Sequence, residues 1–297
     1  MPSFSDPRLV CRPTLRSDTA DILQFTKFIW DGDDYIEYVW KDWLDDPDGL
    51  LATAQYGPHA VGIAKVTHLS PGQWWLEGLR VNPDFQGLKI GSHLHEYMDR
   101  WWITHGDGVI RLMTSSERVQ VHHLCQRTGY AKLGEVAAYR LDISAQRGST
   151  QEPSTLALVA TNDLGSALDF ASAHLAHSAG LMDSGWRFST PDEANMADRI
   201  RQGHLRWWRG RAGLLSTFED EEQGARILAV GFATTVDLRL LPDLLRDVGT
   251  LAQQQGFAAV QWLAPVQAEV QAALQEAGYT TDWMHTGYLY GKAHPGE

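Results

Sequence analysis

One turn of the chain, between Leu79 and Ser92, has the residue types that bind phosphate groups. The run Leu79-Arg-Val-Asn-Pro-Asp-Phe-Gln-Gly-Leu-Lys-Ile-Gly-Ser92 begins as an apolar, β-favouring strand, is stopped by Pro83 and leads through Gln86–Gly91 into a helix. Glycine in such a turn lets backbone N–H groups point into one small space, because no Cβ interferes. Together with the positive end of the helix dipole, these groups predict a phosphate or pyrophosphate site. A tight structural turn has the same residue types and is the alternative interpretation.

Glu77 is the candidate catalytic carboxylate, on the strand that precedes this turn. Alternation along the strand predicts that Glu77, Leu79 and Val81 share one face. A carboxylate beside the apolar residues Trp75 and Leu76 would be desolvated, which suits a general base. A structural salt bridge to a neighbouring arginine is the alternative.

The strand and helix patterns around the turn predict an α+β fold, a sandwich in which a mixed, mostly antiparallel sheet is flanked by helices. Apolar, β-favouring runs separated by Gly-Pro and Ser-Pro-Gly turns indicate the strands, and helical spacing of apolar residues indicates the helices. The expected strands cover 8–15, 50–55, 60–68 and 74–81, and the expected helices cover 18–29, 35–44 and 92–105.

Internal repetition indicates that the chain contains two copies of this unit. The pairs Gly129-Tyr130 and Gly278-Tyr279 are 149 residues apart, and each follows a strand-like run and a helix. The boundary is expected in 145–154, which is rich in Gly, Ser, Thr and Pro and has no apolar periodicity. The predicted domains are therefore 1–146 and 154–297.

The second copy lacks the glycine-containing turn and the candidate catalytic glutamate of the first copy. An offset of 150 residues from Gln86–Gly91 leads to Val236–Leu241, which contains no glycine. The same offset places Ile227 at the position of Glu77. The second copy is therefore expected to be degenerate and non-catalytic, supporting the first domain or closing over its substrate cleft.

Composition excludes several classes of function. The chain has 297 residues, with 37 acidic against 25 basic side chains and a formal charge of −12. An acidic body without a basic run repels nucleic acid and anionic lipid, and no stretch approaches the ~18 apolar residues of a membrane span.

The N-terminus lacks a signal-peptide pattern, and Cys11 and Cys125 alone imply no disulfide framework. We expect a cytoplasmic protein, and the histidines show no metal-ligand spacing, so no metal is expected.

The turn and its flanks resemble motif A of the GNAT superfamily of N-acetyltransferases, through the pattern Leu-x-Val-x-Pro-x-x-Gln-Gly-x-x-Ile-Gly. The resemblance implies two tandem acyl-CoA N-acyltransferase folds and acetyl-CoA as cofactor, with Leu79 and Val81 offering backbone groups to pantetheine. It implies that the pyrophosphate is lined by Gln86, Gly87, Leu88, Lys89, Ile90, Gly91 and Ser92. The run Trp75–Pro83 is also similar, more weakly, to the histidine N-acetyltransferase-like branch.

Two positions depart from the family pattern. Lys89 stands where the family has the central glycine of the loop. Its Cβ could narrow the pyrophosphate site, and its ammonium group could offset the resulting loss of binding by electrostatic attraction. The alternative is that Lys89 is a solvated surface lysine. Cys125 stands where the family has its tyrosine general acid. A thiol could protonate the departing thiolate because the two have similar acidities, and a packed core cysteine is the alternative.

The loop between the first two expected helices overhangs the acceptor site in this family. Trp30, Asp34 and Tyr35 are therefore predicted to bind the substrate, since carboxylates beside aromatic rings attract a cationic amine. Asp31 and Asp33 add to the negative charge there. A solvated acidic loop is the alternative interpretation.

The resemblance leads to an expected function. The first domain would transfer acetyl from acetyl-CoA to the primary amine of a small, amino acid-like molecule, by direct attack in a ternary complex. Glu77 would deprotonate the ammonium, and the backbone near Val81 would polarise the thioester carbonyl. The alternatives are transfer to a peptide or protein N-terminus, a step in making a thiol cofactor, and an acyl-CoA-binding regulator without turnover. The expected partner is the small amine, with a monomer or homodimer as the assembly.

Overall fold

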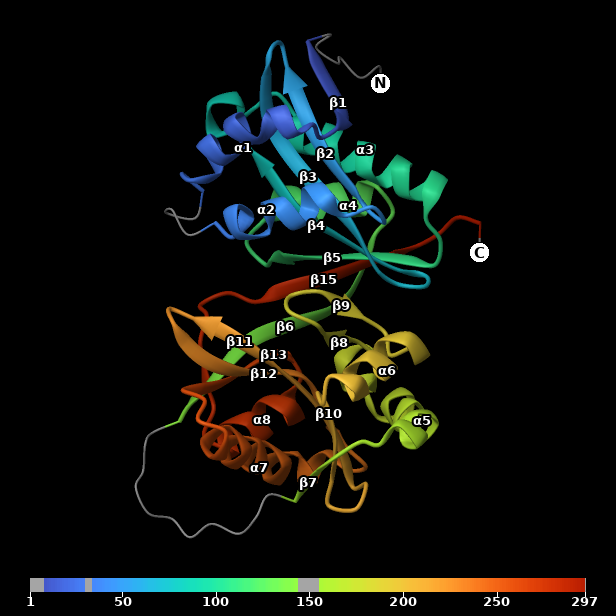
Figure 1. The fold of residues 1–297 in the computed structure, drawn as a ribbon, viewed down its shortest axis with the longest axis vertical. Coiled ribbons are helices and arrows are strands. Elements are labelled where there is room, and N and C mark those ends of the chain that lie inside the picture. Colours follow the sequence, from blue (N-terminus) through green and yellow to red (C-terminus); the bar gives the residue numbers. More distant parts are fainter. Residues whose placement is uncertain (1–7, 30–33, 144–154, 297) are drawn as a thin grey trace. The chain divides into compact units, whose positions relative to one another are not determined.

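The computed structural model describes residues 8–29, 34–143 and 155–296, which form two compact units (Figure 1). The first unit comprises Met1–Leu112, His122–Tyr130 and Gly291–Glu297, and the second comprises Met113–Val121 and Ala131–Tyr290. The predicted linker at 145–154 lies outside the described residues.

A mixed sheet forms the centre of the first unit. Its strands are, in spatial order, β1 (Leu9–Pro13), β2 (Leu50–Tyr56), β3 (His59–Ser70), β4 (Gln73–Val81) and the start of β5 (Val109–Ser115). Neighbours are antiparallel except β4 and β5, which are parallel. A parallel pair needs a crossover connection, and a long helix supplies it here.

Helices cover both faces of this sheet. They are α1 (Thr19–Thr26), α2 (Ile36–Asp45), α3 (Ile90–His105) and α4 (Val119–Arg127). Ile36, Trp40 and Trp43 recur at helical spacing in α2, so one apolar face of this helix is buried with α1 against β2 and β3. The crossover helix α3 packs on the opposite face of the sheet.

A β-bulge at Gly78 interrupts β4. The pairs between β3 and β4 on either side of it are Lys65 with Glu77 and Ile63 with Arg80, so two residues of β4 oppose one residue of β3. Gly78 has φ of 65°, a left-handed conformation that favours glycine. The bulge inverts the alternation of side chains along β4.

The second unit repeats this plan. Its strands are, in spatial order, β6 (Ala131–Asp142), β13 (Ala259–Pro265), β12 (Ala225–Thr235), β11 (Gly213–Glu222), β10 (Leu205–Trp208) and β7 (Leu156–Leu158). The parallel pair is β12 with β13, and β14 (Thr280–Thr281) pairs with β6. The chain ends through β15 (Gly287–Ala293).

Helices and a hairpin complete the second unit. The helices are α5 (Leu164–His174), α6 (Glu193–Arg201), α7 (Leu241–Gln254) and α8 (Ala268–Glu276), and the hairpin is β8 (Met182–Asp183) with β9 (Phe188–Ser189). The crossover helix between β12 and β13 is α7, which buries Leu241, Leu244, Leu245 and Val248 in the core of the unit. The predicted α+β architecture with a mixed, mostly antiparallel sheet is confirmed.

The two Gly-Tyr pairs that revealed the repeat have the same structural role. Gly129 ends α4 and Gly278 ends α8, each with φ of 87°. The N–H groups of Tyr130 and Tyr279 each donate to the carbonyl five residues earlier, at 2.9 Å. This is the Schellman end of a helix, in which glycine adopts the left-handed conformation.

The compact units differ from the predicted halves 1–146 and 154–297. Strand β6 lies in the second unit, because it pairs in register with β13. Residues Gly291–Glu297 lie in the first unit, where Lys292 Nζ contacts both carboxylate oxygens of Asp99 at 2.9 and 2.7 Å. Strand pairing and ion pairing between distant segments set these boundaries, and local composition does not reveal them.

Candidate functional site

The turn between β4 and α3 forms an exposed cradle of backbone N–H groups. Gly87 and Lys89 have φ of 84° and 59°, and residues 86–89 are exposed whereas Ile90 is buried. The N–H groups of Ile90–Ser92 precede the first bond of α3, from His93 N–H to the carbonyl of Lys89 at 3.1 Å. Such groups at a helix N-terminus are free for an anion, because no residue of the helix can accept from them.

Glycine at position 62 lets α3 approach the sheet closely. A Cβ on Gly62 of β3 would lie 3.0 Å from Leu94 Cδ1 and 3.1 Å from Ile90 Cγ2. A Cβ on Gly91 would meet Val81 Cγ2 at 3.7 Å, which is ordinary contact. The N-terminus of α3 therefore lies directly over the end of β4.

Lys89 holds a backbone conformation that its side chain disfavours. A left-handed residue with a Cβ costs about 1 kcal/mol, and glycine avoids this cost. A Cβ at Gly87 would meet nothing within 4 Å, so the cradle has open space beside Lys89. Strain of this kind is found most often at functional sites, which supports a role for the turn beyond connection.

Strand β4 continues beyond the residues that pair with β5. The pairing of β4 with β5 joins Gln73–Trp75 to Val109–Arg111, while β4 runs on to Val81. Asn82 N–H donates to the carbonyl of Val61 in β3 at 2.9 Å. Successive amides of a strand point to opposite edges, so the N–H of Val81 points away from β3. This is the strand segment predicted to bind pantetheine.

The prediction that Glu77, Leu79 and Val81 share one face is wrong. The bulge places Glu77 on the same face as Arg80, since their partners in β3 are two residues apart. Leu79 and Val81 lie on the other face, where their side chains come within 4 Å of the position of a Cβ on Gly91 of α3. Glu77 therefore lies on the side of α1 and α2, which is the expected acceptor side.

The Glu77 carboxylate has a defined setting. Thr67 Oγ1 donates to Glu77 Oε1 at 2.6 Å, and the glutamate is half-buried. Next to it, a Cβ on Gly78 would lie 2.3 Å from Trp43 Cη2, so the indole lies directly against the bulge. Tyr35 packs edge-on against Trp43 with ring centroids 6.1 Å apart. The Trp43 indole thus lies against Gly78, the residue after the predicted base, and against the predicted substrate residue Tyr35.

Asp34 does not have the free carboxylate that the sequence interpretation required. Its oxygens accept from Arg80 Nε at 2.8 Å and Arg80 Nη2 at 3.1 Å, in a buried bidentate ion pair. The guanidinium also lies 5.4 Å from the Tyr35 ring centroid. Asp34 is therefore a structural partner of Arg80, and the half-exposed Tyr35 is the better candidate for contact with an acceptor. Trp30 lies outside the described residues.

Cys125 is placed unfavourably for a general acid. Its side chain is fully buried in α4, and burial raises the pKa of the thiol to about 12. A thiol of that pKa is a weaker acid than an ordinary thiol such as that of CoA, so proton transfer to a departing thiolate would be uphill. The packed-cysteine interpretation fits this position.

Thr67 and Arg80 were not identified as site residues from the sequence. Thr67 meets Glu77 through the pairing of β3 with β4, and Arg80 meets the loop before α2 only because the bulge turns it to that face. A glycine between Glu77 and Arg80 in an otherwise apolar strand is the signal that could have indicated a bulge.

The corresponding turn of the second unit has no such cradle. Residues Val236–Leu241 connect β12 to α7, as the offset predicted, and Asp237 accepts from the N–H of Arg239 at 3.0 Å. The Arg239 guanidinium pairs with Asp237 and lowers its pKa to about 2, so the ionised carboxylate stays bonded to the N–H group that an anion would need. An anion-binding role is therefore disfavoured here. The two parallel pairs start at Gln73 and Ile227, so Ile227 corresponds to Gln73 rather than to Glu77.

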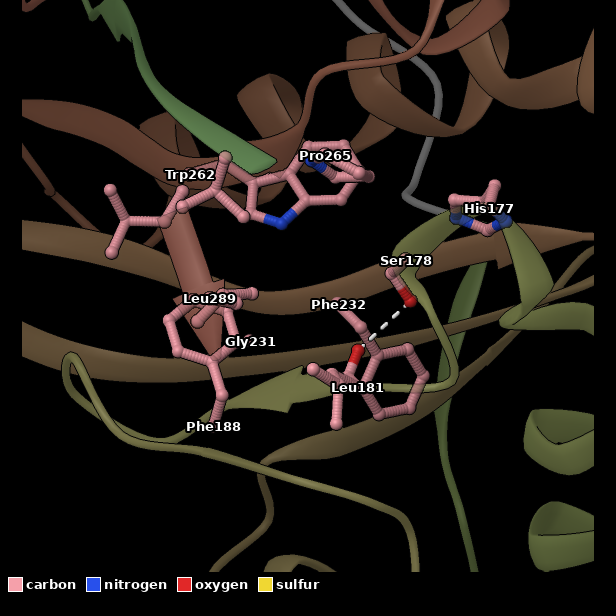
Figure 2. Close-up of a pocket in the computed structure, with 11 residues that line it drawn as sticks. His177, Ser178, Leu181, Phe188, Gly231, Phe232, Trp262, Pro265 and Leu289 are labelled. Atoms are coloured by element: carbon pink, nitrogen blue, oxygen red, sulfur yellow. Dashed lines mark hydrogen bonds between the residues drawn. The ribbon is translucent and has the colours of Figure 1, made fainter. Parts of the chain in front are cut away.

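Bulky side chains occupy the place where β12 and β13 separate. Gly231 is the extra residue of a bulge in β12, between the pairs that Val230 and Phe232 make with β11. Figure 2 shows the small cavity beside it, whose lining includes the rings of Phe188, Phe232 and Trp262. The second unit therefore keeps the bulge of the first unit and lines the adjacent space with apolar rings.

Comparisons with known proteins match the N-terminal part of the chain to a family and the whole chain to a fold. Residues 17–130 match the family model described as Acetyltransferase (GNAT) family. A GCN5-related N-acetyltransferase from Sphaerobacter thermophilus is 13% identical, with 97% of this chain and 96% of that chain covered and a TM-score of 0.65. A putative acetyltransferase from Thermoplasma acidophilum is 14% identical, with 96% and 99% covered and a TM-score of 0.60. No curated protein sequence matches.

A third similar structure has two such domains. A tandem GNAT protein from the clavulanic acid biosynthesis pathway is 13% identical, covering 96% of this chain and 98% of that chain, with a TM-score of 0.56. Identities this low establish the fold alone. The N-terminal part of the chain, residues 17–130, thus matches the GNAT family model, and the chain as a whole has two tandem copies of the GNAT fold. The family chemistry is acyl transfer from acyl-CoA.

No group of His, Cys, Asp or Glu among the described residues is arranged to hold a metal ion. In the same residues, no helix has the length and apolar character needed to span a membrane.

Proposed function

We propose that the first unit transfers an acetyl group from acetyl-CoA to the primary amine of a small, amino acid-like molecule, in a ternary complex. The observation that carries this proposal is the turn from Gln86 to Ser92, an exposed N–H cradle at the start of a 16-residue helix. Within the described residues, the corresponding turn of the second unit has no glycine and holds the Asp237 carboxylate.

The cradle fits the cofactor by chemistry. The N–H groups of Ile90–Ser92 and the Lys89 ammonium would hold the pyrophosphate, and the Val81 N–H would bind the pantetheine end. Acetyl-CoA supplies an activated acetyl thioester. A backbone N–H close to that carbonyl would stabilise the charge that develops on its oxygen.

Glu77 would remove the proton from the acceptor ammonium. It lies on the acceptor side of β4, and the Thr67 hydroxyl orients its carboxylate. Tyr35, half-exposed and packed on Trp43, would contact the acceptor's apolar part. An amine at a peptide N-terminus has the same chemistry and is the alternative acceptor.

A non-catalytic acyl-CoA-binding protein is the second candidate function. The buried Cys125 favours it, because the position at which the family has its general acid has no accessible acid in this chain. This candidate predicts acetyl-CoA binding without acetyl transfer.

The test is an acetyl-transfer assay that measures release of the CoA thiol with a panel of amines, histidine first. Three proteins are compared: wild type, Gly87→Trp and Gly57→Trp. Both glycines have positive φ and open space around them, but Gly57 lies in the β2–β3 turn. We expect release in wild type and Gly57→Trp and loss in Gly87→Trp. If no amine causes release of the CoA thiol but acetyl-CoA still binds, the result would favour the non-catalytic acyl-CoA-binding protein.

A further inference from the structure

A second cavity lies in the second unit, on the sheet face that the β8–β9 hairpin covers. It encloses about 530 Å³ including its open mouth. Phe218, Asp220 and Glu222 of β11 line its floor, because alternate residues of a strand share a face. The hairpin contributes Asp183 and Trp186 to its wall.

Asp183 has a buried oxygen without a partner. The residue is 4% exposed, and burial raises the pKa of its carboxyl group to about 7, while Arg199 and the backbone N–H groups of Ser184, Trp186 and Arg187 favour the ionised form. Its Oδ1 is buried and accepts no hydrogen bond from the described residues. Arg199 donates to the backbone carbonyl of Asp183 at 2.7 Å rather than to the carboxylate. A buried acceptor of this kind is costly, so a donor that enters the cavity would be stabilised there.

Two indole rings stand beside this carboxylate at the cavity wall. Trp186 and Trp283 stack with centroids 4.6 Å apart and an interplanar angle of 27°, and each is 44% exposed. Trp186 has φ of 67° in the hairpin turn, a conformation that favours glycine or asparagine over a bulky residue. The turn therefore holds an exposed aromatic residue at a cost in backbone strain.

The cavity is strongly acidic. Besides Asp183, its lining includes Asp220, Asp282 and Glu222, and none of the described lining residues is basic. Glu222 accepts from Arg140 at 2.6 Å, whereas Asp220 accepts from the N–H of Glu221 at 2.8 Å. Since these carboxylates form no metal-holding group among the described residues, an organic cation matches the charge better than a metal ion.

We propose that this cavity binds an organic cation, an ammonium or guanidinium group attached to a flat apolar group. The cation donates to Asp183 Oδ1, and the apolar group lies against the Trp186 and Trp283 rings. The site belongs wholly to the second unit, so the proposal is independent of acetyl-CoA binding by the first.

The test uses phenethylamine and its neutral analogue 2-phenylethanol, titrated by calorimetry and by tryptophan fluorescence. We expect phenethylamine to bind at least about tenfold more tightly, since the alcohol can still donate to Asp183 Oδ1 but has no positive charge to match the acidic lining. Equal binding of the two, or no saturable binding of phenethylamine, would overturn the proposal. Titration of a capped peptide with one arginine distinguishes the two possible sources of the cation, a free small molecule and a peptide side chain.

Three variants locate the site. Asp183→Asn should weaken phenethylamine binding about tenfold or more, and Glu269→Gln, an exposed carboxylate on α8, should leave it unchanged. Trp186→Gly should weaken binding without lowering the melting temperature, because glycine relieves the strained turn. Unchanged affinity in both Asp183→Asn and Trp186→Gly would refute the assignment, even if one variant folds poorly.

Discussion

The turns that join β4 to α3 and β12 to α7 have the same place in two copies of one fold, yet their chemistry is opposite. The first turn has positive φ at Gly87 and Lys89 and exposes its N–H groups. The second turn has the Asp237 carboxylate bonded to Arg239. The N–H groups of the first turn can attract an anion, whereas in the second turn the Asp237 carboxylate already accepts from a backbone N–H group that an anion would need.

This difference shows which part of the fold is structural and which part is specific to the ligand. Both units keep the parallel strand pair, the crossover helix, the strand bulge at Gly78 or Gly231 and the Gly-Tyr helix end. These features follow from packing and backbone geometry. The anion site depends on a few residues in one turn, so one copy can lose it without losing the fold.

The largest expected effect is on turnover by the first unit. Glu77→Gln should lower kcat by about 10²–10⁴-fold, because a general base contributes that much, while acetyl-CoA affinity stays the same. Steady-state kinetics and calorimetry measure the two quantities. Glu96→Gln, on the exposed side of α3, is the control and should leave both unchanged. Loss of affinity in Glu77→Gln would instead assign the carboxylate to cofactor binding or folding.

A second prediction concerns the C-terminal residues as part of the first unit. Lys292→Ala should lower the free energy of unfolding by about 3 kcal/mol, because it leaves the largely buried Asp99 carboxylate without a cation and with only the Tyr130 hydroxyl as a donor. Chemical denaturation measures this value.

The control for that change is Lys41→Ala. Its ion pair with Asp45 is exposed and should have no measurable effect. Equal effects of the two variants would mean that the contact between Lys292 and Asp99 does not stabilise the first unit.

A third prediction concerns Lys89, the left-handed residue in the anion-binding turn of the first unit. Lys89→Gly should raise the free energy of unfolding by about 1 kcal/mol, because it removes a left-handed residue with a Cβ. The same change should weaken acetyl-CoA binding at low salt, with a smaller loss at high salt, because a charge is removed. If the affinity does not change at any salt concentration, Lys89 is a solvated surface lysine.

The smallest expected effect is a change in the pKa of Asp237, in the turn between β12 and α7. The pKa of Asp237 is lowered to about 2 in the folded state, so its stabilising effect is present above its ordinary pKa and is lost as the pH falls towards 2. Arg239→Ala should return the pKa of Asp237 towards the ordinary aspartate range, as an NMR titration would show. A titration that stays near pH 2 in the variant would mean that Arg239 is not the cause.

Local sequence patterns predicted the α+β fold, the repeat and the position of the turn. Gly129 and Gly278 were detectable because a helix end requires a left-handed residue, and that requirement is local. The inverted faces of β4 were missed because a bulge depends on the partner strand. The pairing of Asp34 with Arg80 was missed for the same reason, since it joins residues 46 positions apart.

The acidic cavity of the second unit could not be predicted either. Its carboxylates and indoles come from β11, the hairpin and the segment before β15, which only the fold brings together. Trp186 and Trp283 are half-exposed, whereas tryptophan is highly buried on average.

Calorimetric titration of acetyl-CoA into wild type and Gly87→Trp tests the central claim most directly, which is that only the first unit has an anion-binding turn. We expect one molecule bound per chain in wild type and none in Gly87→Trp, with normal binding by Gly57→Trp. Two molecules per chain, or binding that survives in Gly87→Trp, would contradict the account.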